Sequence, residues 1–424
     1  MTVISKKDAR ELVEELADAA RASQLEIGQA DADSRNAALR HAAELIRGSE
    51  QQILAANQRD VQRGMKAGLS DAFIDRLTLT EDRIEAMARG AEDIAGLADP
   101  LGVELARWTQ PNGLDITRLS TALGVIGIIY ESRPNVTIDA AALCIKSGNA
   151  CILRGGSDSQ ETSYLLAGLM RDGLKKAGLP ENAVQMIPTS DRLAVDAMLG
   201  ASGKIDVIVP RGGKGLVQRV QEHARVPVFA HLEGICHLFI SARADLKKAV
   251  DIALNAKMRR VGICGSAETI LIEKQATETI GREVVTALIE AGCEVRGSTE
   301  IAALHPGVIA ATPKDWGCEF LAPIIAIKTV TDLPEACRHI QSYGSGHTES
   351  ILSEDIAEQE AFFAAIDSAI VMANASTQFA DGGEFGMGAE IGIATGRLHA
   401  RGPVGANQLT SFKYIVRGHG QTRP

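Results

Sequence analysis

The chain has 424 residues, of which 45% are apolar but only 4% aromatic, and it carries a formal net charge of -10 at pH 7. This length exceeds one compact core, so two or three domains are expected, and the 41 glycines among many small aliphatic residues favour an α/β fold. The acidic balance argues against nucleic-acid or anionic-membrane binding as the main function.

The seven cysteines are scattered without CxxC pairs and without histidines at metal-ligand spacing. A disulfide framework and a metal site are therefore both unexpected. Residues 1–23 form an amphipathic pattern with charges throughout, unlike a signal peptide, and no run of about 18 apolar residues could span a bilayer. The sequence predicts a reduced, cytoplasmic protein.

The N-terminal part is dominated by helical periodicity. Helices are predicted over 7–23, 33–64 with breaks, and 81–97. Segment 108–120 is polar and strand-like, with a Pro-Asn-Gly turn between two arms. Such a ribbon needs a partner to be stable.

From residue 123 onward, apolar strands alternate with helices. The predicted strands are 125–130, 150–153, 183–187, 205–209 and 226–230, and the intervening helices include 161–177 and 193–199. This alternation indicates a doubly wound parallel sheet, with ligands expected beyond the carboxyl ends of its strands.

A second α/β unit begins near His237. Its predicted elements are helix 246–259, strand 269–272, helix 275–291, strands around 294–296 and 324–327, and helices at 332–341 and 354–365. The tail from residue 374 is rich in glycine and ends in a strand-like segment over 408–416.

Cys264 is the cysteine whose position in the sequence best suits a catalytic nucleophile. It lies between a basic helical stretch and an apolar strand, where a thiol can face a cleft, and flanking Arg259 and Arg260 would favour its thiolate. A half-buried structural cysteine is the alternative, because most free cysteines behave as small hydrophobic residues.

Two glycine turns follow predicted strands of the first unit. One is Arg154-Gly155-Gly156, and the other is Arg211-Gly212-Gly213-Lys214, which opens a helix. Glycine lets backbone N–H groups approach a phosphate, and a helix N-terminus adds a favourable dipole. A tight turn requires glycine anyway, but two such turns with cations on one sheet edge favour a nucleotide.

Other polar residues have both a functional and an ordinary interpretation. Asn135 follows a buried strand and could donate to an oxyanion, or it could be a turn residue after proline. Glu233 could be a base or a solvated loop acid, and Glu319 could accept ribose hydroxyls or end a helix. Arg133, His347, Glu384 and Arg401 are candidates for substrate contacts.

Several segments together resemble a known family. They are Leu123–Val136, Lys146–Gly156, Asn255–Arg260 with Cys264, Asn374–Glu390 and Leu398–Pro403. The ordered set resembles the aldehyde dehydrogenase superfamily over nearly the whole chain, and within it the γ-glutamyl phosphate reductases, to which the last two segments are similar.

The resemblance implies an aldehyde dehydrogenase-like fold with two doubly wound parallel-sheet domains and a small β oligomerisation element. It assigns 1–107 and 123–235, with about 372–397 of the tail, to a nucleotide-binding domain. Residues 236–371 form the catalytic domain with Cys264, and 108–122 and 398–424 form the oligomerisation element. A homodimer or dimer of dimers is expected, and transient contact with glutamate 5-kinase is conceivable.

The resemblance also implies roles for single residues. Cys264 is the nucleophile, Asn135 the oxyanion-hole amide, and Glu319 the carboxylate near the nicotinamide ribose. Arg154 stands where many relatives have a cofactor-binding lysine, and Glu233 where hydrolytic relatives keep a general base. The glycine loop at 211–215 departs from the usual form because it carries two cations.

The implied reaction is the NADPH-dependent reduction of L-glutamyl 5-phosphate to L-glutamate 5-semialdehyde through a cysteine thioester, in proline biosynthesis. The nearer alternative is a hydrolytic NAD(P)-dependent semialdehyde dehydrogenase. A noncatalytic nucleotide-binding or structural protein is the more distant one, and the presence of both Cys264 and Asn135 argues against it.

Overall fold

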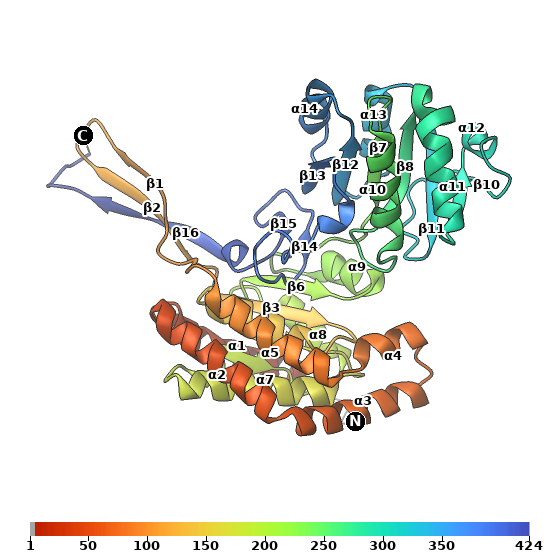
Figure 1. The fold of residues 1–424 in the computed structure, drawn as a ribbon. Coiled ribbons are helices and arrows are strands. Elements are labelled where there is room, and N and C mark those ends of the chain that lie inside the picture. Colours follow the sequence, from red (N-terminus) through yellow and green to blue (C-terminus); the bar gives the residue numbers. More distant parts are fainter. Residues whose placement is uncertain (1–4, 424) are drawn as a thin grey trace. The chain divides into compact units, whose positions relative to one another are not determined.

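The computed structural model describes residues 5–423 (Figure 1). The chain divides into two compact units. Unit 1 comprises the chain up to residue 230, residues 386–392 and the chain from residue 403 onward, and unit 2 comprises 231–385 and 393–402. No described helix is long and apolar enough to cross a membrane.

Three of the five N-terminal helices of unit 1 begin at a short polar side chain, Ser5, Asp31 or Thr80, that accepts a backbone N–H of the first turn. Ser5 accepts the backbone N–H of Asp8, and the Asp8 carboxylate accepts the N–H of Ser5, which satisfies donors that an uncapped helix end would leave open. The N-terminal helices are α1 (Lys6–Ile27), α2 (Ala32–Gly48), α3 (Glu50–Lys66), α4 (Asp71–Leu77) and α5 (Glu81–Gly96).

The main sheet of unit 1 is parallel and has the strand order β5-β4-β3-β6. Its strands are β3 (Val125–Tyr130), β4 (Ala150–Arg154), β5 (Val184–Met186) and β6 (Val207–Arg211). The helices that follow them are α6 (Val136–Lys146), α7 (Gln160–Lys176), α8 (Arg192–Gly200) and α9 (Lys214–His223), with a short 3-10 turn η1 (Glu181–Ala183).

The strand order of this sheet reverses after β5. The connections through α6 and α7 step in one direction, whereas α8 leads back across the sheet to β6. Because such crossovers are right-handed, α8 lies on the opposite face from α6 and α7. This is the doubly wound arrangement predicted from the sequence.

A separate antiparallel sheet in unit 1 joins segments from both parts of the chain. Its order is β1-β2-β16, with β1 (Glu104–Thr109), β2 (Asp115–Ala122) and β16 (Thr410–Arg417). In Figure 1 it projects as an arm from the rest of unit 1. The ribbon expected around 108–120 thus finds its partner in the C-terminal strand of the same chain.

Unit 2 is built on a larger parallel sheet with the order β10-β9-β11-β8-β7-β12-β13. The strands are β7 (Cys236–Ile240), β8 (Ala267–Glu273), β9 (Glu294–Gly297), β10 (Ile309–Ala310), β11 (Ile324–Val330), β12 (Thr348–Leu352) and β13 (Ile370–Ala373). The helical elements are α10 (Leu246–Met258), η2 (Lys274–Ala276), η3 (Thr277–Gly281), α11 (Arg282–Glu290), α12 (Thr299–Ala302), α13 (Leu333–Tyr343), α14 (Ile356–Ala365) and η4 (Thr377–Phe379). The two-residue strands β14 (Ile393–Ala394) and β15 (Gly402–Pro403) pair with each other. The 3-10 turn η5 (Asn407–Leu409) directly precedes β16 in the chain.

The alternation of strand side chains divides the core of unit 2 into two layers. Leu238 and Ile240 of β7 belong to an apolar cluster with residues of α10 and α11. Phe239, which lies between them and points to the other face, belongs to a cluster with residues of α13 and α14. Helices therefore cover both faces, and the strands are buried on both sides as expected for parallel sheets.

Two predictions made from the sequence are wrong in detail. Segment 226–230 is not a strand of the sheet, because only Val228 makes an isolated bridge, to Ile208. Most of the tail over 372–397 lies in unit 2 and only residues 386–392 lie in unit 1, because β13 pairs with β12 and η4 packs against α10.

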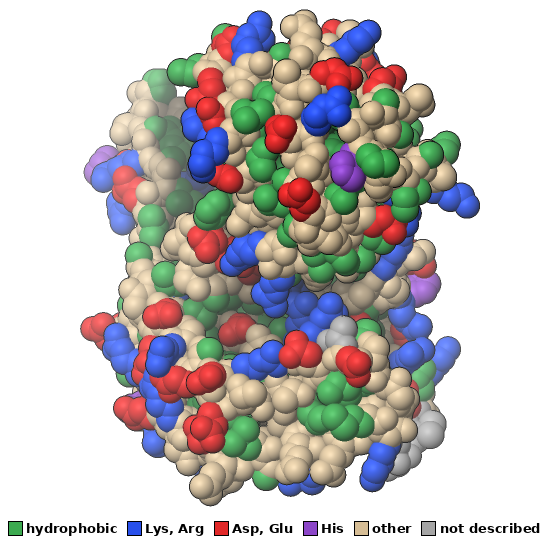
Figure 2. All heavy atoms as spheres, turned by 45° about the vertical axis from the view of Figure 1, so that its right-hand side comes forward, with side chains coloured by type: hydrophobic (Ala, Val, Ile, Leu, Met, Phe, Trp, Pro, Cys, Tyr) green, Lys and Arg blue, Asp and Glu red, His purple; other side chains and the backbone are tan. Residues whose placement is uncertain are grey.

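The surface of each unit carries both signs of charge. On the face drawn in Figure 2, acidic and basic side chains are interspersed with apolar ones. This agrees with the sequence, in which no basic block accompanies the net charge of -10.

Candidate active site

Cys264 lies in the loop between α10 and β8, at the helix-to-strand junction predicted from the sequence. The side chain is half-buried, unlike that of Cys236, which is fully enclosed. Cys264 packs against a small apolar cluster of Ile370, Ala380 and Ile393. A thiol in this position is held by its surroundings and still has access to solvent.

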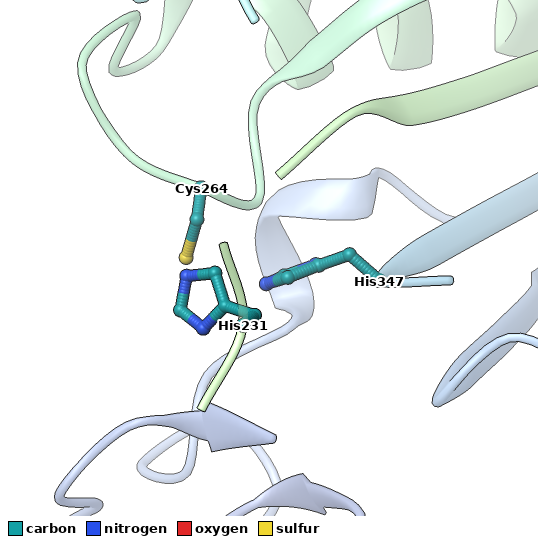
Figure 3. A group of neighbouring side chains, drawn as sticks. All are labelled: His231, Cys264 and His347. Carbon is teal, nitrogen blue, oxygen red and sulfur yellow. The ribbon is translucent and has the colours of Figure 1, made fainter. Parts of the chain in front are cut away.

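Two histidines meet Cys264 at the amino edge of the unit 2 sheet. Strands β8, β7 and β12 are adjacent and parallel, so the loops that precede them meet at one edge. These loops carry Cys264, His231 and His347, whose ligand-type atoms all lie within 4.8 Å of one another. Figure 3 shows the three side chains pointing toward one another.

The two imidazole rings are fixed by contacts of their Nδ1 atoms. His231 Nδ1 lies 2.6 Å from the backbone oxygen of Ile393, and His347 Nδ1 lies 2.8 Å from Thr348 Oγ1. The rings meet edge to face, with centroids 5.1 Å apart. Since a carbonyl oxygen only accepts, the neutral imidazole of His231 carries its proton on Nδ1, and its Nε2 is then the lone-pair acceptor.

The Cys264 loop is held by close backbone contact with the segment that carries His231. A Cβ atom on Gly234 would lie 2.2 Å from the carbonyl oxygen of Cys264 and 2.6 Å from its Cα, so only glycine fits here. On the other side, a Cβ on Gly265 would lie 3.1 Å from the carbonyl oxygen of Thr377. The position of the thiol therefore depends on both glycines.

Gln378 on η4 joins the tail of unit 2 to the end of α10. Its buried amide Nε2 donates to the carbonyl oxygens of Ala256 (2.9 Å) and Arg260 (3.4 Å). Its Oε1 accepts from Arg259 Nη1 at 3.3 Å. One carbonyl in the last turn of α10, which the helix itself leaves open, and one carbonyl just beyond the helix thus find a partner.

The influence of the two flanking arginines on the Cys264 thiolate stays a prediction. Arg259 and Arg260 are exposed, and Arg259 donates to Gln378. The groups that lie beside the thiol are instead the imidazoles of His231 and His347. Either ring could accept the proton of the thiol when it reacts.

Cys236 is the nearest other thiol and is not a competing nucleophile. Its Sγ donates to the carbonyl oxygen of Cys264 at 3.1 Å and lies 3.5 Å from His347 Nδ1. Burial raises the pKa of the Cys236 thiol well above its usual range, so it stays protonated. Cys236 therefore supports the backbone of the reactive loop.

Glu233 and Glu319 are both neighbours of Gly234. Glu233 precedes Gly234 in the chain, and Glu319 contacts the backbone of Gly234 from a distant segment. Glu319 Oε1 accepts the backbone N–H of Gly234 at 2.8 Å, and this bond holds the His231 segment in place. Glu233 is half-buried and directly precedes Gly234, which touches the Cys264 backbone. The ribose contact of Glu319 and the base role of Glu233 remain predictions.

The predicted substrate-binding residues are divided between the two units, with Arg133 in unit 1 and the other three in unit 2. His347 is buried beside Cys264, whereas Glu384 is exposed in the tail segment of unit 2. Arg401 forms an ion pair with Asp367 at 2.6 Å, so its guanidinium already has an anionic partner. Arg133 is half-buried in unit 1, in the loop before α6.

The predicted cofactor residues other than Glu319 lie at the carboxyl ends of β4 and β6 in the unit 1 sheet. Arg154 is buried, its Nη2 donates to the carbonyl oxygen of Ser190 at 2.6 Å, and burial lowers the pKa of its guanidinium. Gly213 caps α9 without a side-chain hydrogen bond, and nothing lies within 4 Å of a Cβ placed there. Its N–H donates to Glu131 Oε2 at 3.1 Å.

Asn135 is the N-cap of α6 in unit 1. Its Nδ2 donates to Asp139 Oδ2 at 3.0 Å, which orients the amide. Burial raises the pKa of the Asp139 carboxyl to about 6, and the bond from Asn135 partly opposes that shift. The role of Asn135 toward an oxyanion on the Cys264 substrate remains a prediction.

His231 was not among the site residues predicted from the sequence. It lies 33 positions before Cys264 and 116 before His347, so no local motif connects the three. A correct prediction of the β8-β7-β12 neighbour relation would have brought the three preceding loops together.

Comparison with known proteins identifies the family. The model of the aldehyde dehydrogenase family matches residues 2–306. The γ-glutamyl phosphate reductase of Parvibaculum lavamentivorans is 55% identical over 420 residues, covering 99% of this chain and 99% of that protein. The enzyme of the same name from Rhizobium etli is 54% identical over 424 residues, covering 100% and 99%.

The fold agrees with a solved structure. The crystal structure of γ-glutamyl phosphate reductase from Thermotoga maritima superposes with a TM-score of 0.95 at 41% identity, covering 98% of this chain and 100% of that one. The aldehyde dehydrogenase fold predicted from the sequence is therefore confirmed. The chain belongs to the aldehyde dehydrogenase family and, within it, to the γ-glutamyl phosphate reductases.

Proposed function

We propose that this chain reduces L-glutamyl 5-phosphate to L-glutamate 5-semialdehyde and inorganic phosphate, as a step of proline biosynthesis. The observation that carries the proposal is the half-buried Cys264 thiol held against two imidazoles, in a chain whose full-length relatives are named γ-glutamyl phosphate reductase. An acyl phosphate is a suitable substrate for such a thiol because phosphate is a good leaving group.

The first chemical step is attack of the Cys264 thiolate on the acyl carbon. The S–C bond forms, the C–O bond to phosphate breaks, and inorganic phosphate leaves with the bonding electrons. The thiol proton passes to the lone pair on Nε2 of His231 or to His347, both of which lie in the same group. A glutamyl thioester remains on Cys264.

A nicotinamide cofactor, which we propose to be NADPH, supplies the hydride when bound. The residues that would hold its phosphates are at the N-terminus of α9, where Gly213 leaves open space and no side chain caps the helix. Arg154 is less suited to a 2′-phosphate because its guanidinium is buried against Ser190. Lys214, the first residue of α9, is exposed and is the better candidate.

Asn135 and the backbone N–H of Cys264 are the proposed donors to the oxyanion that forms at the acyl carbon. The Asn135 amide is oriented by Asp139, which accepts one of its two N–H groups and leaves the other for a ligand. A donor fixed in advance stabilises developing charge without reorganisation. Asp139 is thus a positioning residue for Asn135.

The hydrolytic alternative is favoured by one observation, the position of Glu233 directly before Gly234 at the Cys264 backbone. A carboxylate near the acyl carbon could activate water against the thioester. A reductase must avoid this reaction, because it would waste the activated acyl group. We propose that Glu233 contacts the substrate instead, with Glu233→Gln lowering substrate affinity without changing phosphate dependence.

The experiment that separates the two reactions runs the enzyme backwards. Glutamate 5-semialdehyde and oxidised cofactor are mixed with and without inorganic phosphate, and cofactor reduction is followed at its near-ultraviolet absorbance. The reductase needs phosphate as acyl acceptor, so omission should reduce steady-state turnover to background. Turnover that ignored phosphate would establish the hydrolytic enzyme, and Cys264→Ala is the control for both.

We also propose that the chain acts in the cytoplasm as a homo-oligomer formed through the β1-β2-β16 sheet. This sheet exposes the aromatic side chains of Trp108, Phe412 and Tyr414. Light scattering of the Tyr414→Glu variant tests the proposal, which predicts a smaller assembly than the unmodified chain forms.

A further inference from the structure

His231, Cys264 and His347 together offer three atoms that can bind a metal ion. None of the proposed catalytic steps needs all three residues. A proton acceptor for the thiol needs one imidazole, yet two are present, and all three donor atoms lie within 4.8 Å of one another. We propose that these residues form a binding site for a thiophilic divalent cation, with Zn²⁺ as the ion that fits best, and that the bound ion takes Cys264 out of reaction.

The spacing of the donor atoms is close to that of a tetrahedral zinc site. Zinc binds histidine nitrogen and cysteine sulfur at about 2.0–2.3 Å, which places neighbouring donors roughly 3.5 Å apart. The separations of at most 4.8 Å therefore close with side-chain movements on the order of 1 Å. Cys264 lies on a loop and is half-buried, so its side chain can rotate without opening the core.

The contacts of the two rings orient them as metal ligands. His231 donates its Nδ1 N–H to the carbonyl oxygen of Ile393 (2.6 Å), so in the neutral ring the lone pair is on Nε2, which is directed at the Cys264 sulfur (Figure 3). His347 Nδ1 is held by Thr348 Oγ1 (2.8 Å), and the ring extends toward His231. A backbone carbonyl behind the ligating ring, as His231 has, is a usual outer partner of a metal-bound histidine.

The chemistry of the donors selects the kind of ion. One thiolate and two imidazoles suit Zn²⁺ and similar borderline ions, whereas Mg²⁺ and Ca²⁺ require oxygen ligands. Three protein ligands leave a fourth position for water. His231 and Cys264 are partly exposed, which gives the ion a path from solvent, while His347 is buried.

Binding consumes the reactive form of the cysteine. The thiol loses its proton to solvent, and the resulting thiolate lone pair forms the Zn–S bond. Alkylation of Cys264 is then blocked, and so, resting on the proposed function, is thioester formation. Chelation of the ion restores the free thiol, so the block is reversible.

The test uses the full chain, purified without a histidine tag and stripped with a chelator. Co²⁺ serves as the spectroscopic probe, because cobalt bound to a thiolate gives a sulfur-to-metal charge-transfer band in the near ultraviolet. We expect one equivalent of Co²⁺ per chain to produce this band and one equivalent of Zn²⁺ to abolish it. Magnesium in large excess should have no effect.

Variants assign the band to the three residues. Cys264→Ser should abolish it, and His231→Ala should weaken Co²⁺ affinity at least tenfold. Cys318→Ser is the matched control, since Cys318 is another half-buried cysteine of unit 2 and should leave the band unchanged. His347 is fully buried, so His347→Gln is compared only if circular dichroism shows a native fold, and His231→Ala carries the test otherwise.

A second measurement does not depend on catalysis. Zn²⁺ should slow alkylation of Cys264 by iodoacetamide at least tenfold, as counted by peptide mass, and EDTA should reverse the protection. Absence of the cobalt band, or its survival in Cys264→Ser, would overturn the proposed site. Because neither readout uses substrate, loss of the proposed reductase activity would leave this result standing, and the reverse also holds.

Discussion

Because Gly234 and Cys264 are in close contact, we expect the substitution of Gly234 by alanine to lower both the stability of the chain and its kcat. In Gly234→Ala the new Cβ would lie 2.2 Å from the Cys264 carbonyl oxygen, 2.6 Å from its Cα and 2.7 Å from its carbonyl carbon. All three are backbone atoms, so no flexible side chain can move aside. The two segments must separate by about 1 Å or more to reach ordinary contact distance.

The cost of this separation falls on both stability and rate. Forcing an extra carbon into a packed site typically lowers the free energy of unfolding by about 1–3 kcal/mol. A misplacement of about 1 Å at a reacting group can cost about 100-fold in rate. The Glu319 bond to the Gly234 N–H and the Cys236 bond to the Cys264 carbonyl would both be strained. We expect kcat to fall by about two orders of magnitude.

Three measurements on Gly234→Ala check this reasoning. They are initial rates in the phosphate-dependent assay, the rate of Cys264 alkylation, and the urea midpoint of unfolding. Gly168→Ala is the control, because Gly168 lies within α7 with nothing within 4 Å of its Cβ position, so alanine there should stabilise the helix by about 0.5–1 kcal/mol. A Gly234→Ala enzyme with unchanged kcat and alkylation rate would refute the inferred dependence of the thiol on this contact.

Further predictions concern Asn135, Asp139 and Gln378. Asn135→Ala should lower kcat by about 100- to 1,000-fold through loss of one oxyanion donor, about 3 kcal/mol, and a loss of less than about fivefold would exclude that role. Burial raises the pKa of Asp139 to about 6, so the folded state favours its protonated form. The stability that this provides is present below about pH 4 and is lost as the pH rises through 6, by about 3 kcal/mol. Urea unfolding between pH 4 and 8 should show that this slope is smaller in Asp139→Asn, and an identical slope would contradict the assignment. Gln378→Ala leaves the Ala256 carbonyl without its buried donor and should cost about 1–3 kcal/mol of stability, measured as the shift in urea midpoint against the unmodified chain.

The strands and helices of clear periodicity were predictable from the sequence, and the exceptions have physical reasons. Helix α6 was not predicted, because every one of its residues except Asp139 is buried and no polar stripe marks a helical period. Strand β12 was not predicted either, because it reads Thr-Glu-Ser-Ile-Leu yet is buried throughout. Its Glu349 accepts from the backbone N–H and Nδ1 of His237, a partner far away in the chain.

The candidate site was predictable in part. The position of Cys264 between a helix and a strand could be inferred locally, and the structure agrees. The influence of Arg259 and Arg260 was inferred from sequence proximity, but both side chains are exposed and the neighbours of the thiol come from other loops. Which loops meet is decided by strand order, which the residues around Cys264 do not encode.

The formation of the acyl group on Cys264 tests the account most directly. The enzyme is mixed with glutamate 5-semialdehyde and oxidised cofactor in the absence of phosphate, quenched in acid, and digested for peptide mass analysis. We expect one glutamyl group on the Cys264 peptide with about one equivalent of reduced cofactor, and loss of that group when phosphate is added before the quench. A glutamyl-free Cys264 accompanied by continued cofactor reduction, or a thioester that phosphate does not discharge, would contradict it.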